Sequence, residues 1–277
     1  MIAALIIVFR EVFEAGLIIG IVLAVTRTVP RRNGWIGGGV LAGVLAACVV
    51  AACAGALSNL FAGMGQELFN AAILALAVVM LTWHNVWMAR HGKELAGKLR
   101  AAGQAVVAGE KSLLALAVVV GVAVLREGSE VVLFLYGVLA TGSDTTWGVA
   151  LGGFAGLVLG APVCWLTYVG LLKIPSRALF ATTTVLIALL AAGMAAQATA
   201  FLERANWLTA LDTVVWDSSS LLSDSSLLGK ALHTLIGYTD QPTAMQLIVY
   251  LAILAVTFAL MRLYGRPART ATPAPAE

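Results

Sequence analysis

Two clusters of charged residues, each inside a long apolar stretch, are the residues of this sequence best suited to chemistry. The first cluster reads Arg10-Glu11-Val12-Phe13-Glu14, and the second reads Arg126-Glu127-Gly128-Ser129-Glu130. On a helix, residues three or four positions apart share a face, so both glutamates of a copy point the same way and the arginine reaches the second glutamate. Charged side chains within a membrane are costly and usually pair inside the protein. The repeated Arg-Glu-x-x-Glu pattern therefore predicts a buried site near the middle of a membrane.

The chemistry that this pattern favours is the binding of a hard cation. Four carboxylates and two guanidinium groups would leave two negative charges in excess, and carboxylate oxygens suit ferric iron, manganese, calcium and protons alike. The alternative is that the Arg–Glu pairs only hold helices together. We expect Glu11, Glu14, Glu127 and Glu130 to be the metal ligands, with Arg10 and Arg126 tuning them.

Two residues outside the motifs are weighed as accessory groups. Glu67 stands at the outer mouth of an apolar stretch, where it is a candidate entry ligand or else a solvated carboxylate at a helix end. His84 lies between Trp83 and Trp87. It is expected to be a residue of the aromatic belt at the membrane surface, near the cytoplasmic end of its stretch, with a role as exit ligand as the alternative.

The composition decides which kind of structure must position these residues. The chain has 277 residues, of which 61% are hydrophobic and 11% charged, against about 25% charged in soluble domains. About 20 apolar residues in a helix cross a hydrocarbon core. The sequence therefore predicts an all-α polytopic membrane protein with seven transmembrane helices, at residues 2–26, 35–57, 68–88, 112–141, 147–172, 178–199 and 245–264.

The two motif copies also belong to a longer internal repeat. Trp35 opens the apolar stretch after the first copy and Trp147 opens the one after the second, and glycine-rich sequence follows both. Because each unit has three helices, the second unit must cross the membrane in the opposite sense, which is an inverted repeat. The expected divisions of the membrane domain 1–264 are the first repeat 1–90, a cytoplasmic loop 91–111, the second repeat 112–199, an external segment 200–245 and a seventh helix 246–264, followed by a disordered cytoplasmic tail 265–277.

The basic residues predict the orientation. Thirteen of them follow the first, third, fifth and seventh apolar stretches, whereas only Arg204 and Lys230 lie on the other side. Cytoplasmic loops carry the excess of lysine and arginine, so the N-terminus is expected outside and the C-terminus in the cytoplasm. Within the connecting segments, 91–110 is expected to be a helical hairpin, an amphipathic helix or a plain connector. Ser225 and Gly237 are expected to bound a short external helix.

The paired motif resembles that of the iron permease family, the oxidase-dependent iron transporters of fungi and their bacterial counterparts. The family's hallmark is an Arg-Glu-x-x-Glu motif in the first and fourth of seven membrane helices, as at 10–14 and 126–130. The stretches Met80-Leu81-Thr82-Trp83 and Trp216-Asp217-Ser218-Ser219 are also similar to the family. The resemblance implies a permease that is not an enzyme and that imports ferric iron across the bacterial inner membrane. It implies no cofactor and no nucleic acid; the partners would be the iron ion, the lipid bilayer and an extracytoplasmic oxidase or iron-delivery protein.

Two departures from the family pattern keep other functions open. Val12 stands where the commonest family form has glycine, and the external Glu-x-x-Glu motifs of fungal members have no counterpart in the sequence. Relatives of the family carry other metals, including lead. The alternatives are a transporter of lead or manganese on the same architecture, an intramembrane metal-dependent enzyme, and a scaffold that binds metal without moving it.

Overall fold

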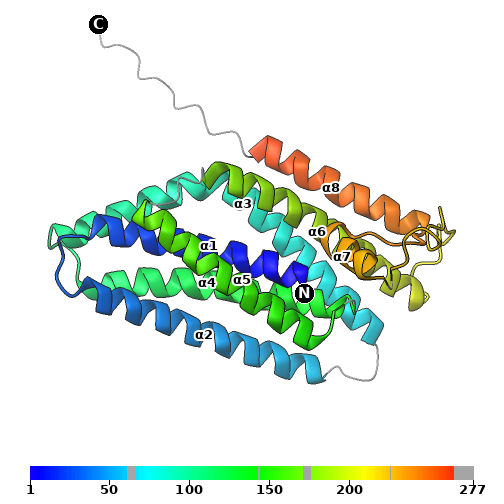
Figure 1. Cartoon of the computed structure of the whole chain (residues 1–277), viewed down its shortest axis with the longest axis horizontal. Coiled ribbons are helices and arrows are strands. Elements are labelled where there is room, and N and C mark those ends of the chain that lie inside the picture. Colours follow the sequence, from blue (N-terminus) through cyan, green and yellow to red (C-terminus); the bar gives the residue numbers. More distant parts are fainter. Residues whose placement is uncertain (61–65, 143, 171–175, 225, 265–277) are drawn as a thin grey trace, which may run out of the picture.

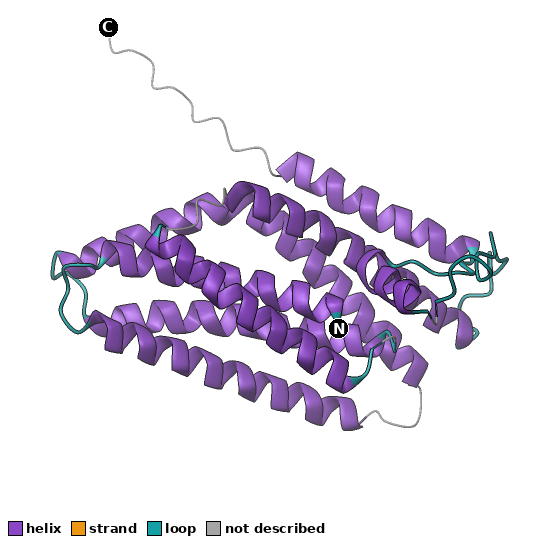
Figure 2. Ribbon diagram, viewed as in Figure 1, coloured by secondary structure: helices purple, strands orange, loops and turns teal. Residues whose placement is uncertain are grey.

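The regular structure of the protein is helical. The computed structural model describes residues 1–60, 66–142, 144–170, 176–224 and 226–264. Within these ranges the only strand-like pairing is an isolated bridge between Val214 and Thr243. The helices, shown in Figures 1 and 2, are α1 (Ile2–Val25), α2 (Arg32–Leu60), α3 (Gln66–Val107), α4 (Leu113–Ala140), α5 (Thr146–Val169), α6 (Ser176–Arg204), α7 (Leu227–Ile236) and α8 (Ala244–Tyr264).

Each apolar stretch singled out in the sequence lies in its own long helix. Five of these helices, α2, α3, α5, α6 and α8, are long and apolar enough to cross a membrane. Helices α1 and α4 have 24 and 28 residues, but the three charged residues of one motif interrupt each of them. The prediction of an all-helical membrane protein is therefore confirmed, with five apolar spans among the described residues.

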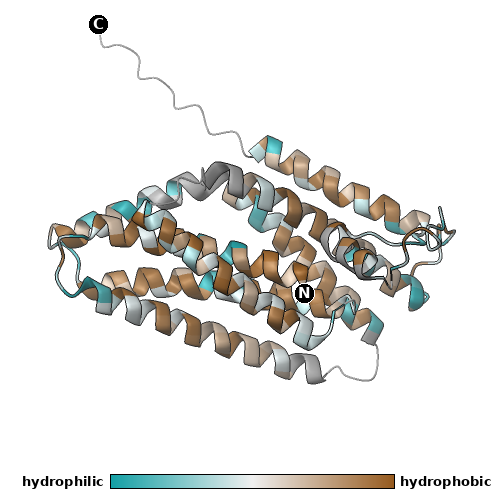
Figure 3. Ribbon diagram, viewed as in Figure 1, coloured by the Kyte–Doolittle hydropathy of each residue, from teal (hydrophilic) through white to brown (hydrophobic). Residues whose placement is uncertain are grey.

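Large apolar side chains cover the outside of the bundle. Only 6% of the most apolar part of α8 is buried inside the protein, and the corresponding share is 22% for α2 and for α5. Trp147, Leu151 and Phe154 of α5 are all exposed. Figure 3 shows hydrophobic residues along most of the long helices. An apolar surface of this extent is unfavourable in water and suits contact with lipid.

The polar segment 91–107 continues α3 as one helix as far as Val107, so of the forms expected for it the structure matches an amphipathic helix and differs from a hairpin and from a plain loop. Leu99 and Val106 are seven positions apart, hence on one face of this extension. Both are buried in an apolar cluster with Ile18 and Val22 of α1. The extension is helical because it has this apolar face to bury, whereas the loop prediction rested on its charged residues.

The short helix expected between Ser225 and Gly237 is α7, and its N-terminal cap lies one residue later than expected. The N-terminal cap is Ser226, whose hydroxyl oxygen accepts a hydrogen bond from the amide of Gly229, whereas Ser225 lies outside the described residues. The helix ends as predicted at Gly237, which has a φ of 70°. A left-handed residue that closes a helix is usually glycine, because it has no Cβ to clash with the preceding turn.

Two close helix–helix contacts hold the motif helices in the centre of the bundle. Glycine residues make the close approach possible, and each contact is called a glycine seam below. Helix α1 packs on α5, and a Cβ at Gly156 of α5 would lie 2.5 Å from the carbonyl oxygen of Leu5 and 2.9 Å from the amide nitrogen of Phe9. Helix α2 packs on α4 in the same way, and a Cβ at Gly43 would lie 2.6 Å from the carbonyl oxygen of Gly121. Small residues allow such close approach of helix backbones in membranes. Since α1 and α4 also contact each other, the seams bring the two motifs face to face.

Candidate metal centre

The first motif forms a buried cluster of ion pairs on α1. Arg10 places its Nε atom 2.8 Å from Oε1 of Glu14 and donates from Nη1 to Oε1 of Glu11 at 3.4 Å. All three side chains are buried. The spacing predicted from the sequence is therefore realised: the glutamates share one face of the helix, and the arginine bridges them from one turn before Glu14.

The second motif repeats this arrangement on α4. Arg126 donates from Nε to Oε1 of Glu130 at 3.1 Å, and the same nitrogen lies 3.9 Å from Oε1 of Glu127. Both glutamates are buried. Glu127 faces Glu11, and their carboxyl groups interact across the contact between α1 and α4. The structure thus brings together all four glutamates that the sequence singled out.

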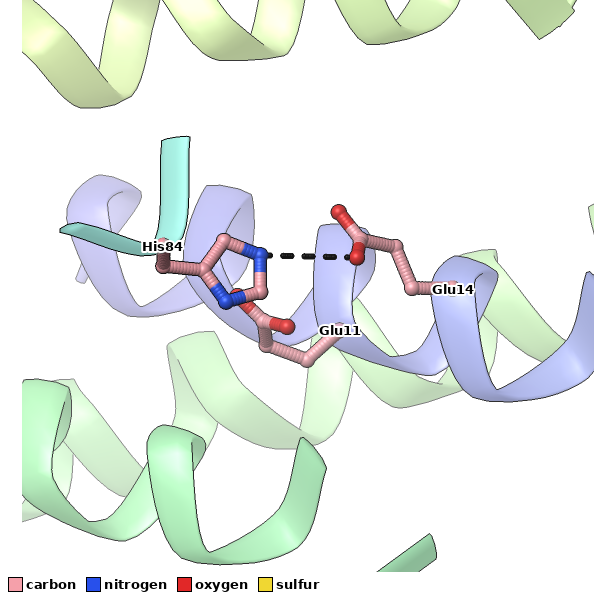
Figure 4. A group of neighbouring side chains, drawn as sticks. All are labelled: Glu11, Glu14 and His84. Atoms are coloured by element: carbon pink, nitrogen blue, oxygen red, sulfur yellow. Dashed lines mark ion pairs between the residues drawn. The ribbon is translucent and has the colours of Figure 1, made fainter. Parts of the chain in front are cut away.

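His84 of α3 completes the cluster, and its expected place in a surface aromatic belt is wrong. Only 3% of its surface is exposed. Its Nε2 lies 3.4 Å from Oε2 of Glu14, and its Nδ1 contacts Oε2 of Glu130. Figure 4 shows the ring between the helices, close to Glu11 and Glu14. The adjacent Asn85 is also buried, and its amide atoms have no hydrogen-bond partner among the described residues.

The donor atoms are close enough together to hold a metal ion. Among the described residues, two groups of three each have their ligand atoms within 4.8 Å of one another, namely Glu11, Glu14 and His84, and His84, Glu127 and Glu130. Four carboxylates against two guanidinium groups leave two negative charges when the imidazole is neutral. Like charges this close in a low-dielectric interior repel strongly, so a bound cation would relieve the repulsion.

Apolar residues close the cluster on both sides along the helices. Ile7, one turn before the first motif, and Phe134, one turn after the second, belong to one buried apolar cluster. Ile18, after the first motif, and Val124, before the second, belong to the other. The order of the clusters along α1 is thus reversed along α4. In this conformation the charged residues are separated from both ends of the bundle.

The two arginines differ in their surroundings. Arg10 has a side chain 2% exposed, whereas that of Arg126 is 36% exposed. The guanidinium carbon of Arg126 lies 4.2 Å from the centre of the Trp87 ring, a distance at which the cation is attracted to the aromatic face. Trp87 is one turn beyond His84 on α3. The second motif is therefore the more accessible half of the cluster.

Glu67 is the one candidate residue that the structure does not bring to this cluster. It is exposed in the first turn of α3, and 17 residues separate it from His84 on the same helix, or about 25 Å at the helical rise. The role of Glu67 as an entry ligand stays a prediction, and it concerns the start of α3 and not this cluster.

Comparison with known proteins gives one family and a set of similar bacterial proteins. The chain matches the Iron permease FTR1 family over residues 1–265. It is 31% identical over 271 residues to the ferrous iron permease EfeU of Escherichia coli O6:H1, covering 96% of this chain and 97% of that protein. It is 33% identical over 248 residues to the ferrous iron permease EfeU of Yersinia pseudotuberculosis, covering 88% and 86% of the two chains.

No solved structure matches the chain. The family match spans both motif helices, the helix that carries His84 and the segment between α6 and α8. With the apolar helices already described, it identifies a multi-pass membrane protein. The chain belongs to the iron permease FTR1 family.

Proposed function

We propose that this protein imports iron across the bacterial inner membrane through the site formed by its two Arg-Glu-x-x-Glu motifs. The observation that carries the proposal is the burial of Glu11, Glu14, Glu127 and Glu130 in two adjoining groups of possible ligands that share His84 inside an apolar bundle. Buried charges of this kind are expensive, and in membrane proteins they mark ion pathways. Iron is the transported substrate. The protein acts as a permease without a cofactor, and not as an enzyme.

The ion that suits the site best is ferrous iron. Two uncompensated negative charges are neutralised by one divalent cation, whereas a trivalent ion would leave a positive charge in a low-dielectric interior. The two relatives compared above are ferrous iron permeases. The ferric iron expected from the family resemblance, and the extracytoplasmic oxidase or delivery protein, stay predictions.

The two motif units act as inverted repeats within seven membrane-spanning helices. Three features support this architecture: the same arginine–glutamate pairs occur in both motifs, the apolar clusters are reversed along α1 and α4, and each motif helix packs by a glycine seam on the second helix of the other unit. Transporters of this design bind their substrate at the repeat interface and expose it alternately to the two sides. The closed cluster described here corresponds to the occluded step of such a cycle.

The N-terminus is outside and the C-terminus is in the cytoplasm. The support is the concentration of basic residues that follow the apolar stretches 2–26, 68–88, 147–172 and 245–264, because cytoplasmic segments are enriched in lysine and arginine. We expect a phosphatase that is active only in the periplasm to be inactive when it is fused after Glu277. We expect a fluorescent protein that fluoresces in the cytoplasm to be bright at the same place. The opposite pair of results would reverse the orientation.

The substrate is tested by radioactive iron uptake into proteoliposomes that contain the purified protein. We expect uptake of Fe²⁺, supplied with ascorbate, to exceed that of Fe³⁺ by at least about tenfold, and an inside-negative potential to accelerate it. The potential contributes about 2.3 kcal/mol per charge per 100 mV, so a divalent ion gains twice this amount.

Protein-free liposomes are the control for the uptake measurement, and Mn²⁺ and Pb²⁺ serve as competitors. Faster uptake of Fe³⁺ would restore the ferric assignment. If Mn²⁺ or Pb²⁺ crosses and iron does not, the architecture stands and the substrate is wrong.

A further inference from the structure

His84 belongs to neither motif but contacts a glutamate of each. Its Nε2 lies 3.4 Å from Oε2 of Glu14 on α1, while its Nδ1 contacts Oε2 of Glu130 on α4. The two ring nitrogens of an imidazole point in different directions. The ring can therefore present one nitrogen to each motif without turning.

We propose that His84 is a nitrogen ligand shared by two alternative iron subsites, which one ion occupies in turn. The first subsite consists of Glu11, Glu14 and Nε2 of His84, and the second consists of Glu127, Glu130 and Nδ1 of the same ring. Each set of three ligand atoms lies within 4.8 Å. This inference rests on the proposed function, since it assigns the ligands and the selectivity of the same iron site.

The hydrogen-bond pattern of the ring fits both subsites. A histidine that binds a metal through one nitrogen usually donates the N–H of the other to a carboxylate, which orients the ring and strengthens it as a ligand. When the ion is in the first subsite, Nδ1 can donate to Glu130. When the ion is in the second subsite, Nε2 can donate to Glu14. Each motif thus supports the histidine while the other motif binds the ion. Transfer of the ion from Nε2 to Nδ1 therefore requires the ring proton to move in the opposite direction, from Nδ1 to Nε2.

The charges indicate that only one subsite is filled at a time. All four glutamates and Arg10 are buried, and Arg126 is half-buried. One Fe²⁺ balances the two negative charges that the arginines leave. A second divalent ion would add two positive charges without counterions, at a high cost in a low-dielectric interior. The expected stoichiometry is one ion per chain.

The nitrogen ligand also provides selectivity. Carboxylates and water alone suit Mg²⁺, Ca²⁺ and Mn²⁺, whereas imidazole suits iron, zinc, copper and nickel. A site of glutamates alone would compete poorly for Fe²⁺ against Mg²⁺ and Ca²⁺. His84 therefore favours Fe²⁺ over these ions.

The test is Fe²⁺ binding to the full chain in lipid nanodiscs, under anaerobic conditions and with an affinity tag that contains no histidine. Iron titration gives stoichiometry and Kd, and X-ray absorption at the iron edge detects imidazole by its outer-shell scattering. We expect one Fe²⁺ per chain with imidazole bound. His84→Gln should remove the imidazole scattering and raise the Kd by at least about 100-fold, because loss of only a hydrogen-bond partner of a metal ligand already costs about 10- to 100-fold in affinity. It should also reduce the preference for Fe²⁺ over Ca²⁺.

The matched control is His233→Gln, which removes a histidine outside the cluster. His233 contacts the carbonyl oxygen of Tyr238 through its Nδ1, and its replacement should leave Kd and scattering unchanged. A wild-type spectrum without imidazole, or one unchanged in His84→Gln, would overturn the proposal. The wild-type spectrum is decisive even if the variant does not fold.

Two double variants distinguish a protein with two alternative subsites from a protein with a single site of four carboxylates. Arg10→Gln with Glu14→Gln, and Arg126→Gln with Glu130→Gln, each remove one ion pair and so keep the two negative charges of the cluster. Each should still bind one Fe²⁺ with imidazole, at reduced affinity. Complete loss of binding in both folded double variants would show a single site and contradict the proposal.

The outcomes for this inference and for the proposed function are distinguishable. Iron uptake by a protein whose bound iron has no imidazole would reject the shared ligand and retain the permease. If the protein binds one iron ion with imidazole but moves no iron, the shared ligand would be retained and the permease function rejected.

Discussion

Glu14→Gln and Glu130→Gln should each lower iron uptake at least 100-fold while the protein remains in the membrane at its normal level. Glu14 pairs with Arg10 and His84, and Glu130 pairs with Arg126 and His84. Glutamine keeps the shape of the side chain but removes the charge. Leaving one member of a buried ion pair uncompensated costs about 3–5 kcal/mol, and a tenfold change corresponds to 1.36 kcal/mol. The lower uptake should result both from weaker binding of iron and from slower transfer of the ion between the two motifs.

The measurement is the initial rate of Fe²⁺ uptake into proteoliposomes, normalised to the amount of protein inserted. Glu94→Gln is the matched control. Glu94 is on α3, is largely exposed and forms a surface ion pair with Lys98, and such pairs contribute about 0–1 kcal/mol. Its uptake should stay within twofold of the wild type. Normal uptake in both Glu14→Gln and Glu130→Gln would eliminate the four-carboxylate site.

Gly156→Val should destabilise the protein strongly, because it separates the first motif helix from α5. Its side chain would overlap the backbone of Leu5 and Phe9 and the side chain of Val8. Overpacking of this kind costs about 1–3 kcal/mol, and more where the backbone cannot move. For a chain of this size we expect a fall in Tm of about 10 °C, measured in detergent from the loss of monodisperse protein after heating.

The matched control is Gly38→Val on α2. A Cβ at Gly38 would have no atom within 4 Å, so the same substitution should leave the Tm within about 2 °C of the wild type. Equal loss of stability in the two variants would mean that valine harms these helices by itself and that the close contact of α1 with α5 contributes nothing.

The sequence by itself determined the class of protein and singled out the four carboxylates that the structure brings together. Charged residues in the middle of apolar stretches are rare enough to be informative, and their repetition at Arg10–Glu14 and Arg126–Glu130 pointed to one shared site. Helix ends were also readable where caps are local. Gly237 ends α7 as expected, because the left-handed conformation there depends on neighbours in the chain.

Only the tertiary structure placed His84. Its helix is apolar on nearly all sides around this position, with Leu81 buried and Trp83 exposed, so hydrophobic periodicity does not show which face turns inward. The same holds for the extension of α3, whose helical state depends on Leu99 and Val106 packing against α1. A single histidine among aromatic residues resembles a residue of the membrane surface.

The physical reason is that the ligands come from three helices distant in the sequence. Glu14 and His84 are 70 residues apart, and Glu130 follows 46 residues later. Their meeting depends on how α3 is rotated and on how closely the glycine seams let α1 and α4 approach. Local sequence determines which residues can bind iron, whereas the packing of helices determines that a nitrogen joins the carboxylates.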